Sequence, residues 1–230
     1  MNAPILVVFE APRDRIIDHI RKYYPDHGFL AEESNDGSCL KIMPSGADRF
    51  WWIIDPIDGT NNYAHKIPIF GVSIAVMHSG CPVVGVIYEP VSDSMFTASL
   101  GAPAMLNDQC IMVSDESVSR FASIVVDPNF EVNLKPSLVD LMLKTRFRNL
   151  GAATLHIAYV AKGSFIGCIL TGPKLWDIAA GAIIIECAGG ILTDWQFKDV
   201  FPIQVEQYQP QRMKILCSNK IAFNEIKQHI

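Results

Sequence analysis

The segment that most constrains this chain is an apolar run that leads directly into two carboxylates, WWIIDPIDGT at residues 51–60. An apolar run followed by Pro and Gly predicts a buried strand that stops at a turn. Asp55 and Asp58 then lie close together at the carboxyl end of the strand, where α/β proteins commonly bind ligands. Two such carboxylates repel each other unless a cation lies between them. Their oxygens suit a hard ion such as Mg2+, so the segment predicts a metal site.

Gly59 and Thr60 follow these carboxylates and extend the prediction to an anion. They fit the task of bringing backbone N–H groups close to a phosphate, particularly if a helix starts there. The simpler alternative is a surface turn, because Asp, Pro and Gly each favour turns for local reasons. Two further segments favour the site over the turn.

Each of these segments places carboxylates near the end of a predicted element. A helix with apolar residues at 16, 17 and 20 should end before Pro25, and a short strand over residues 28–31 then delivers Glu32 and Glu33. Residues 175–190 predict a helix with Asp177 as its N-cap and glycines as its stop. Small residues on the first turn of this helix would let it pack closely.

In this order, the three segments resemble the signatures of the inositol monophosphatase family, which are metal-dependent, lithium-sensitive phosphatases. The matching stretches are AEES at 31–34, WIIDPIDGTNNY at 52–63 and WDIAAG at 176–181, and GAA at 151–153 is a fourth match. The resemblance covers most of the chain from about residue 21 onward, and the second signature is long and specific. It implies Mg2+ as cofactor and hydrolysis by two-metal, in-line displacement.

The resemblance also implies roles for individual residues. The metal ligands would be four carboxylates and one backbone carbonyl, those of Glu32, Asp55, Asp58, Asp177 and Ile57. The catalytic residues would be Glu32, Asp55, Asp58, Thr60 and Asp177. The substrate contacts would come from Asp58, Gly59, Thr60, Gly151, Ala153 and Asp177. Glu32 would take the proton of the attacking water, whereas Glu33 and Glu186 are expected to be solvated neighbours.

Two features depart from the family pattern. Family members usually begin with a helix that this chain lacks, and they carry an aspartate at the position of Phe9; a one-residue slip would offer Glu10 instead. Seven residues before Asp177, inositol phosphatases place a glutamate that binds the ring hydroxyls, and this chain has Leu170. Because Leu cannot replace that hydrogen bond, phosphatase chemistry is better supported than inositol as the substrate.

Three functions follow for comparison. The first is a Mg2+-dependent phosphomonoesterase that acts on a small polyol or sugar phosphate. The second is a phosphatase for 3'-phosphoadenosine 5'-phosphate or fructose 1,6-bisphosphate, for which Lys162 and Lys174 are the nearest basic groups that could bind a second phosphate. The third is a catalytically impaired regulatory family member that keeps the metal site as a scaffold.

The composition of the chain disfavours some classes of binding partner. The chain has 230 residues, of which 50% are hydrophobic, and a net charge of -5 that disfavours a clamp on nucleic-acid backbones. Its six cysteines form no C-x-x-C pair, which favours buried free thiols in a reducing cytoplasm. No apolar stretch approaches the roughly 18 residues of a membrane span. We therefore expect a cytoplasmic protein with no nucleic-acid or membrane partner. The resemblance implies a small phosphate ester as its partner and the homodimer that is common in the family.

The pattern of strands and helices predicts an α+β half followed by an α/β half. Strand patterns in the first half form an antiparallel meander over residues 67–77, 81–89 and 92–100. Strands and helices then alternate over residues 123–126, 136–144, 146–149 and 155–162. The polar stretch 114–120 sets the boundary, with residues 1–117 carrying the metal loop and residues 118–230 completing the active site. The resemblance implies a layered α-β-α-β-α sandwich that lacks the first helix of the family.

The remaining candidate ligands or bases are three histidines, His65, His78 and His156. Each is isolated in the sequence from the carboxylate segments, so we expect them to be surface or core histidines.

Overall fold

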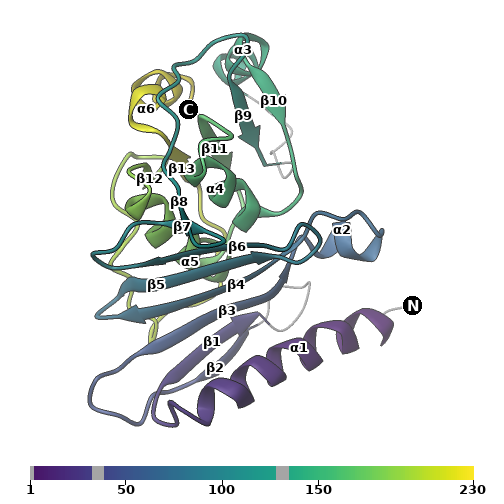
Figure 1. Ribbon diagram of the computed structural model, residues 1–230, viewed down its shortest axis with the longest axis vertical. Helices are drawn as coiled ribbons and strands as arrows, with labels where there is room; N and C mark the ends of the chain where they lie inside the picture. Colours follow the sequence, from purple (N-terminus) through teal and green to yellow (C-terminus); the bar gives the residue numbers. More distant parts are fainter. Residues whose placement is uncertain (1–2, 33–38, 128–134) are drawn as a thin grey trace.

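Five alternating layers of helices and strands make up the computed structural model of this protein (Figure 1). It describes residues 3–32, 39–127 and 135–230, with side chains from residue 12 onward. The helices are α1 Ala3–Arg21, α2 Thr60–Ala64, α3 Pro136–Lys144, α4 Ala153–Ala161, α5 Leu175–Cys187, α6 Lys220–Ile226 and a final 3-10 turn, Lys227–His229. Helix α1 covers one face of the first sheet, α4 and α5 lie between the two sheets, and α3 and α6 lie beyond the second (Figure 1). The predicted α-β-α-β-α sandwich is confirmed.

The first sheet has eight strands in the order β2-β1-β3-β4-β5-β6-β7-β8. Their bounds are β1 Gly28–Glu32, β2 Cys39–Ile42, β3 Trp51–Asp58, β4 Gly71–His78, β5 Cys81–Glu89, β6 Ser94–Ser99, β7 Met105–Leu106 and β8 Gln109–Cys110. Strands β1 and β3 are parallel, and every other neighbouring pair is antiparallel. The predicted meander is therefore confirmed, whereas β2 and the short β7–β8 hairpin were not predicted.

The second sheet has five strands in the order β10-β9-β11-β13-β12. Their bounds are β9 Ser123–Val126, β10 Arg146–Arg148, β11 Gly167–Leu170, β12 Ile191–Asp194 and β13 Ile215–Ser218. Strands β10, β9 and β11 are parallel, and β13 and β12 continue the sheet in antiparallel pairing. The predicted alternation of strands and helices is confirmed up to α4, but the pattern did not predict β13 or α6.

Strand β3 does not stop where the sequence indicated. It runs through Pro56 to Asp58, and its register with β4 shifts by one residue between Asp55 and Asp58. Pro has no N–H for the ladder, and a break in pairing is the place in a sheet that tolerates it. The shift keeps both carboxylates on a continuous strand instead of on a turn.

Helix α5 packs unusually close to its neighbours because two glycines make room for it. A Cβ added at Gly85 of β5 would lie 2.5 Å from the carbonyl oxygen of Ala180 in α5. A Cβ added at Gly181 would lie 2.8 Å from the side chain of Ile157 in α4. One large core cluster joins both sheets across these helices, so the position of α5 relative to the first sheet is tightly fixed. The division at residues 117 and 118 stays a prediction.

Two predictions from composition can also be compared with the structure. None of the six cysteines forms a disulfide bond; Cys168 and Cys217 are buried as expected, but Cys81 and Cys110 are exposed. Within the described ranges, no helix has the length and apolar character that crossing a membrane requires.

Candidate active site

Three carboxylates from different elements converge at one edge of the first sheet. Glu32 is the last residue of β1, and Asp55 lies near the end of the parallel strand β3, so the two side chains share that edge. Asp177 comes from the first turn of α5. Oxygen atoms of the three carboxylates all lie within 4.8 Å of one another. The folded chain therefore brings Asp177 beside two carboxylates that lie more than a hundred positions earlier in the sequence.

Asp177 is held by the start of α5, but it is not the N-cap that we predicted. Lys174 occupies the N-cap position, and its backbone N–H donates to Asp177 Oδ2 at 2.7 Å. Asp177 is the third residue of the helix, and its side chain accepts from the N–H of the N-cap residue, as the acidic member of a capping box does. This bond holds its carboxylate beside those of Asp55 and Glu32.

The three converging carboxylates concentrate negative charge in a small region of the protein. Burial raises the pKa of Asp55 well above its ordinary value, and the nearby carboxylates of Glu32, Asp58 and Asp177 raise it further. Burial also raises the pKa of Asp177 well above its ordinary value, with Asp58 and Glu32 as the next causes. Lys174 is a partial counter-charge, with Nζ 3.8 Å from Glu32 Oε1.

A divalent cation would relieve this repulsion, and the chemistry of the donor set fits one. All of the converging ligand atoms are carboxylate oxygens, which hard ions such as Mg2+ prefer over nitrogen or sulfur. The family resemblance predicted this set, and the geometry permits it.

Asp58 lies at the end of β3 and is anchored to the start of α4. Its Oδ2 atom accepts hydrogen bonds from the backbone N–H of Thr154 at 2.7 Å and from the Thr154 hydroxyl at 2.6 Å. Burial raises the pKa of Asp58, whereas these bonds oppose the rise. Sequence reasoning missed Thr154, although a hydroxyl residue in the first turn of a helix that follows a Gly-Ala-Ala match was a usable signal.

Hydrogen bonds within residues 55–60 hold the end of β3 and the start of α2 in place. The N–H of Ile57 donates to Asp55 Oδ1 at 2.9 Å, and the Thr60 hydroxyl donates to the Ile57 carbonyl at 3.1 Å. Gly59 has φ +82, a conformation that favours glycine, and α2 begins at the next residue. A helix therefore does start at Thr60. The side chains of Phe9 and Glu10, and all of Glu33, lie outside the described part of the chain.

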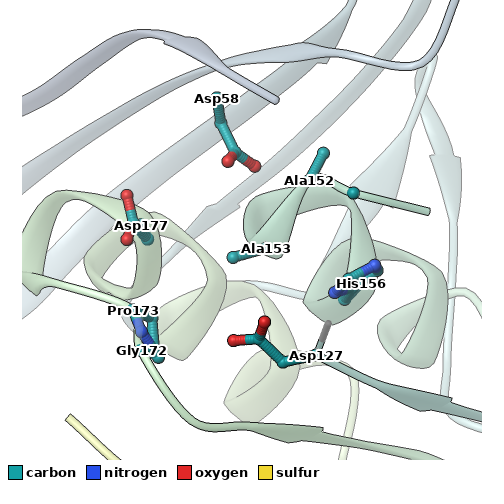
Figure 2. Close-up of a pocket in the computed structure, with 9 residues that line it drawn as sticks. Asp58, Asp127, Ala152, Ala153, His156, Gly172, Pro173 and Asp177 are labelled. Atoms are coloured by element: carbon teal, nitrogen blue, oxygen red, sulfur yellow. The ribbon is translucent and has the colours of Figure 1, made fainter. Parts of the chain in front are cut away.

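A cavity of about 160 Å3 adjoins these carboxylates (Figure 2). The residues that line it are Asp58, Asp127, Gly151, Ala152, Ala153, His156, Gly172, Pro173 and Asp177. Gly151 and Ala153, which we predicted to contact substrate, therefore lie in the same cavity wall as Asp58 and Asp177. Glu32, Asp55, Gly59 and Thr60 are not part of the described lining.

Comparison with known proteins agrees with this geometry. The sequence model described as "Inositol monophosphatase family" matches residues 4–229. The chain belongs to the inositol monophosphatase family.

Relatives within the inositol monophosphatase family carry different names. A protein of Pasteurella multocida (strain Pm70) called "Nus factor SuhB" is 37% identical over 204 residues, which span 84% of this chain and 73% of the relative. A "Fructose-1,6-bisphosphatase/inositol-1-monophosphatase" of Thermotoga maritima is 37% identical over 186 residues, 80% of this chain and 68% of the relative. The solved inositol monophosphatase of Anabaena (Nostoc) sp. PCC 7120 superposes with a TM-score of 0.80 at 31% identity, covering 98% of this chain and 86% of the other.

In this member of the inositol monophosphatase family, two residues line the cavity that were not predicted to do so from the sequence. His156, which was predicted to be a surface or core histidine, is buried, but it also lines the cavity with Asp58 and Asp177 because α4 packs against α5. Asp127 follows β9 and lines the same cavity, and no motif in the sequence marks it. His65 and His78 are exposed, as predicted.

Leu170 does not face the cavity. It is fully buried in β11, where it pairs with Ile215 and belongs to the large core cluster. A glutamate at this position would therefore lie in the core and would not contact a substrate ring.

We expect Leu170→Glu to lower the free energy of unfolding by roughly 3 kcal/mol or more, because it buries an unpaired carboxylate. Thermal unfolding measures this loss, and inositol phosphate hydrolysis should not increase. Leu170→Met is the matched control, with a cost of less than about 1.5 kcal/mol. A stable Leu170→Glu variant with faster inositol phosphate hydrolysis would show that the side chain reaches the substrate.

Proposed function

We propose that this protein is a Mg2+-dependent phosphomonoesterase that hydrolyses the phosphate ester of a small polyol or sugar. The observation that carries the proposal is the convergence of Glu32, Asp55 and Asp177 beside a cavity that Asp58 and Asp177 line. Clustered carboxylates next to an open cavity suit chemistry in which cations and a phosphate meet.

In this proposal, Glu32, Asp55, Asp58 and Asp177, with the Ile57 carbonyl, are the groups that would hold Mg2+. Bound there, the metal would lower the pKa of water and neutralise phosphoryl charge. Glu32 accepts the proton of the attacking water.

The remaining residues position the ester for in-line attack. Asp58, fixed by its two bonds from Thr154, holds its place beside the phosphate. Backbone N–H groups at Gly59 and Thr60 donate to phosphoryl oxygens as charge develops on them. Asp177 also meets a hydroxyl of the leaving group, and Gly151 and Ala153 shape the pocket around it.

The alternative substrates with a second phosphate lack support at this cavity. None of the described residues that line it is Lys or Arg. The ammonium of Lys162 lies over the ring of Tyr159, 3.4 Å from its centroid, and that of Lys174 lies beside Glu32. The regulatory alternative draws on relatives called "Nus factor SuhB" and predicts a folded protein without phosphatase activity. The same proposal includes a homodimer, a cytoplasmic location and no nucleic-acid or membrane partner.

The test is phosphate release from a panel of polyol, sugar and nucleotide monophosphates and bisphosphates while Mg2+ is titrated. We expect release that requires Mg2+, stops with EDTA and favours polyol or sugar monophosphates. Preferential release from the bisphosphates would support the second function. A folded protein that releases phosphate from none of these esters at any Mg2+ concentration would contradict the proposal and support the regulatory alternative.

A further inference from the structure

The wall of the cavity across from Asp58 and Asp177 carries a carboxylate that none of the predicted roles uses. Asp127 follows β9, and its backbone N–H donates to the Ile169 carbonyl of the parallel strand β11 at 2.9 Å. Its Oδ2 atom accepts from the N–H of Thr171 at 3.1 Å. These bonds hold the side chain at the carboxyl ends of two parallel strands, where α/β sheets commonly bind ligands. Asp127 is 8% exposed, so it is a buried acceptor at the cavity.

His156 supplies a hydrogen-bond donor to the same wall. The N–H of Leu150 donates to His156 Nε2 at 3.0 Å, so this nitrogen carries a lone pair. Burial lowers the pKa of His156 to about 3, which keeps the ring neutral near pH 7. The single ring proton is therefore on Nδ1. Nδ1 is buried and has no hydrogen-bond partner among the described residues, although His156 is only 2% exposed.

An unpaired buried donor is costly, and the cavity is the place where a ligand can pair it. Figure 2 shows Asp58 and Asp177 on one side of this space and Asp127 and His156 on the other. A phosphate ester whose phosphate lies beside Asp58 would therefore extend its leaving group towards Asp127 and His156.

The chemistry of this pair matches a hydroxyl group better than any charged group. A hydroxyl can donate to the Asp127 carboxylate, and the oxygen of a hydroxyl can accept from His156 Nδ1. An ammonium could donate to Asp127 but could not accept from Nδ1. A second phosphate could accept from Nδ1 but would face the negative charge of Asp127, with no described Lys or Arg in the lining to offset it.

We propose that Asp127 and His156 form the subsite that binds the hydroxyl groups of the leaving group and selects monophosphates of neutral polyols over bisphosphates. This inference rests on the proposed phosphatase function and specifies its substrate class. Both residues act as specificity residues, because they meet the leaving group and not the reacting phosphorus. They supply hydroxyl recognition at a place other than Leu170.

A purely structural role for both residues is the competing explanation, because each also accepts a bond from a backbone N–H. The variants are chosen to separate the two. Asp127→Asn keeps an acceptor for Thr171 but removes the charge. His156→Gln keeps an amide oxygen as acceptor for Leu150 but replaces the fixed Nδ1–H with an amide NH2 at a different position. Asp140→Asn, at an exposed position of α3, is the matched control for Asp127→Asn.

The experiment compares kcat/KM for myo-inositol 1-phosphate, fructose 1,6-bisphosphate and p-nitrophenyl phosphate, whose leaving group carries no other hydroxyl. We expect Asp127→Asn and His156→Gln each to lose about tenfold more kcat/KM on the inositol ester than on p-nitrophenyl phosphate, mainly through KM. Asp127→Asn should also shift the preference towards the bisphosphate. Asp140→Asn should change none of these ratios.

Equal losses on all three esters, with thermal unfolding midpoints lowered, would mean that the residues are structural and would overturn the inference. Calorimetric binding of the inositol ester in Mg2+ separates this result from failure of the proposed function. If the wild-type protein binds the ester, needs Asp127 to do so and releases no phosphate, hydrolysis is overturned and the subsite stands. If it neither binds nor hydrolyses any of these esters, both proposals are overturned.

Discussion

Asp58→Asn is expected to reduce Mg2+-dependent phosphate release by about a thousandfold while the protein stays folded. The substitution removes one negative charge from the proposed metal ligands and changes the group beside the phosphate. Asn keeps a carbonyl oxygen that can accept from Thr154, so the link between β3 and α4 survives. Release from the best substrate of the panel measures the loss, and circular dichroism with thermal unfolding checks the fold.

Asp140→Asn is the control for this substitution as well, because it removes the same charge from an exposed position of α3. It should leave phosphate release within about twofold of wild type, since exposed substitutions away from the site have small effects. Activity of Asp58→Asn close to that of wild type would exclude Asp58 from the metal and phosphate site.

The second large effect concerns metal-dependent stability. Without metal, Asp55→Asn should raise the unfolding midpoint, because it removes a buried charge that three neighbouring carboxylates repel. In wild type, Mg2+ at about 100 times its dissociation constant should stabilise the fold by roughly 2.7 kcal/mol, or about 5–10 °C in midpoint. Asp55→Asn should lose most of this increase, since it lacks the ligand charge.

Differential scanning calorimetry with EDTA and with Mg2+ measures both effects on the same samples. Asp127→Asn is an informative comparison, because it removes a buried carboxylate that is not part of the converging cluster. It should keep most of the Mg2+-induced increase. If wild type and Asp55→Asn gained equal stability from Mg2+, the ion would bind elsewhere.

The sequence predicted the parts of the site that are contiguous in the chain. The apolar run before Asp55 and the strand before Glu32 specify elements by local pattern, and the family resemblance supplied their order. The predicted N-cap role of Asp177 was wrong by three residues, because a capping box and an N-cap place an acidic residue near the same helix start. Helix boundaries depend on such local competition.

The far wall of the cavity could not be predicted in the same way. Asp127 and His156 come from a strand end and a helix, and neither lies near a carboxylate segment in the sequence. These two residues come to line one cavity because β9 pairs in parallel with β11 and because α4 packs beside α5. Likewise, only the pairing of β3 with β4 reveals the register shift that carries the strand through Pro56.

The placement of Asp177 on a helix that packs against β5 has a consequence for how the molecule holds together. An ion bound by Asp55 and Asp177 would act as a crosslink that closes a loop of about half the chain. Loading of the ion and docking of α5 would then be linked equilibria, each favouring the other. When the ion leaves, the close contact at Gly85 must hold α5 in place against the mutual repulsion of the carboxylates.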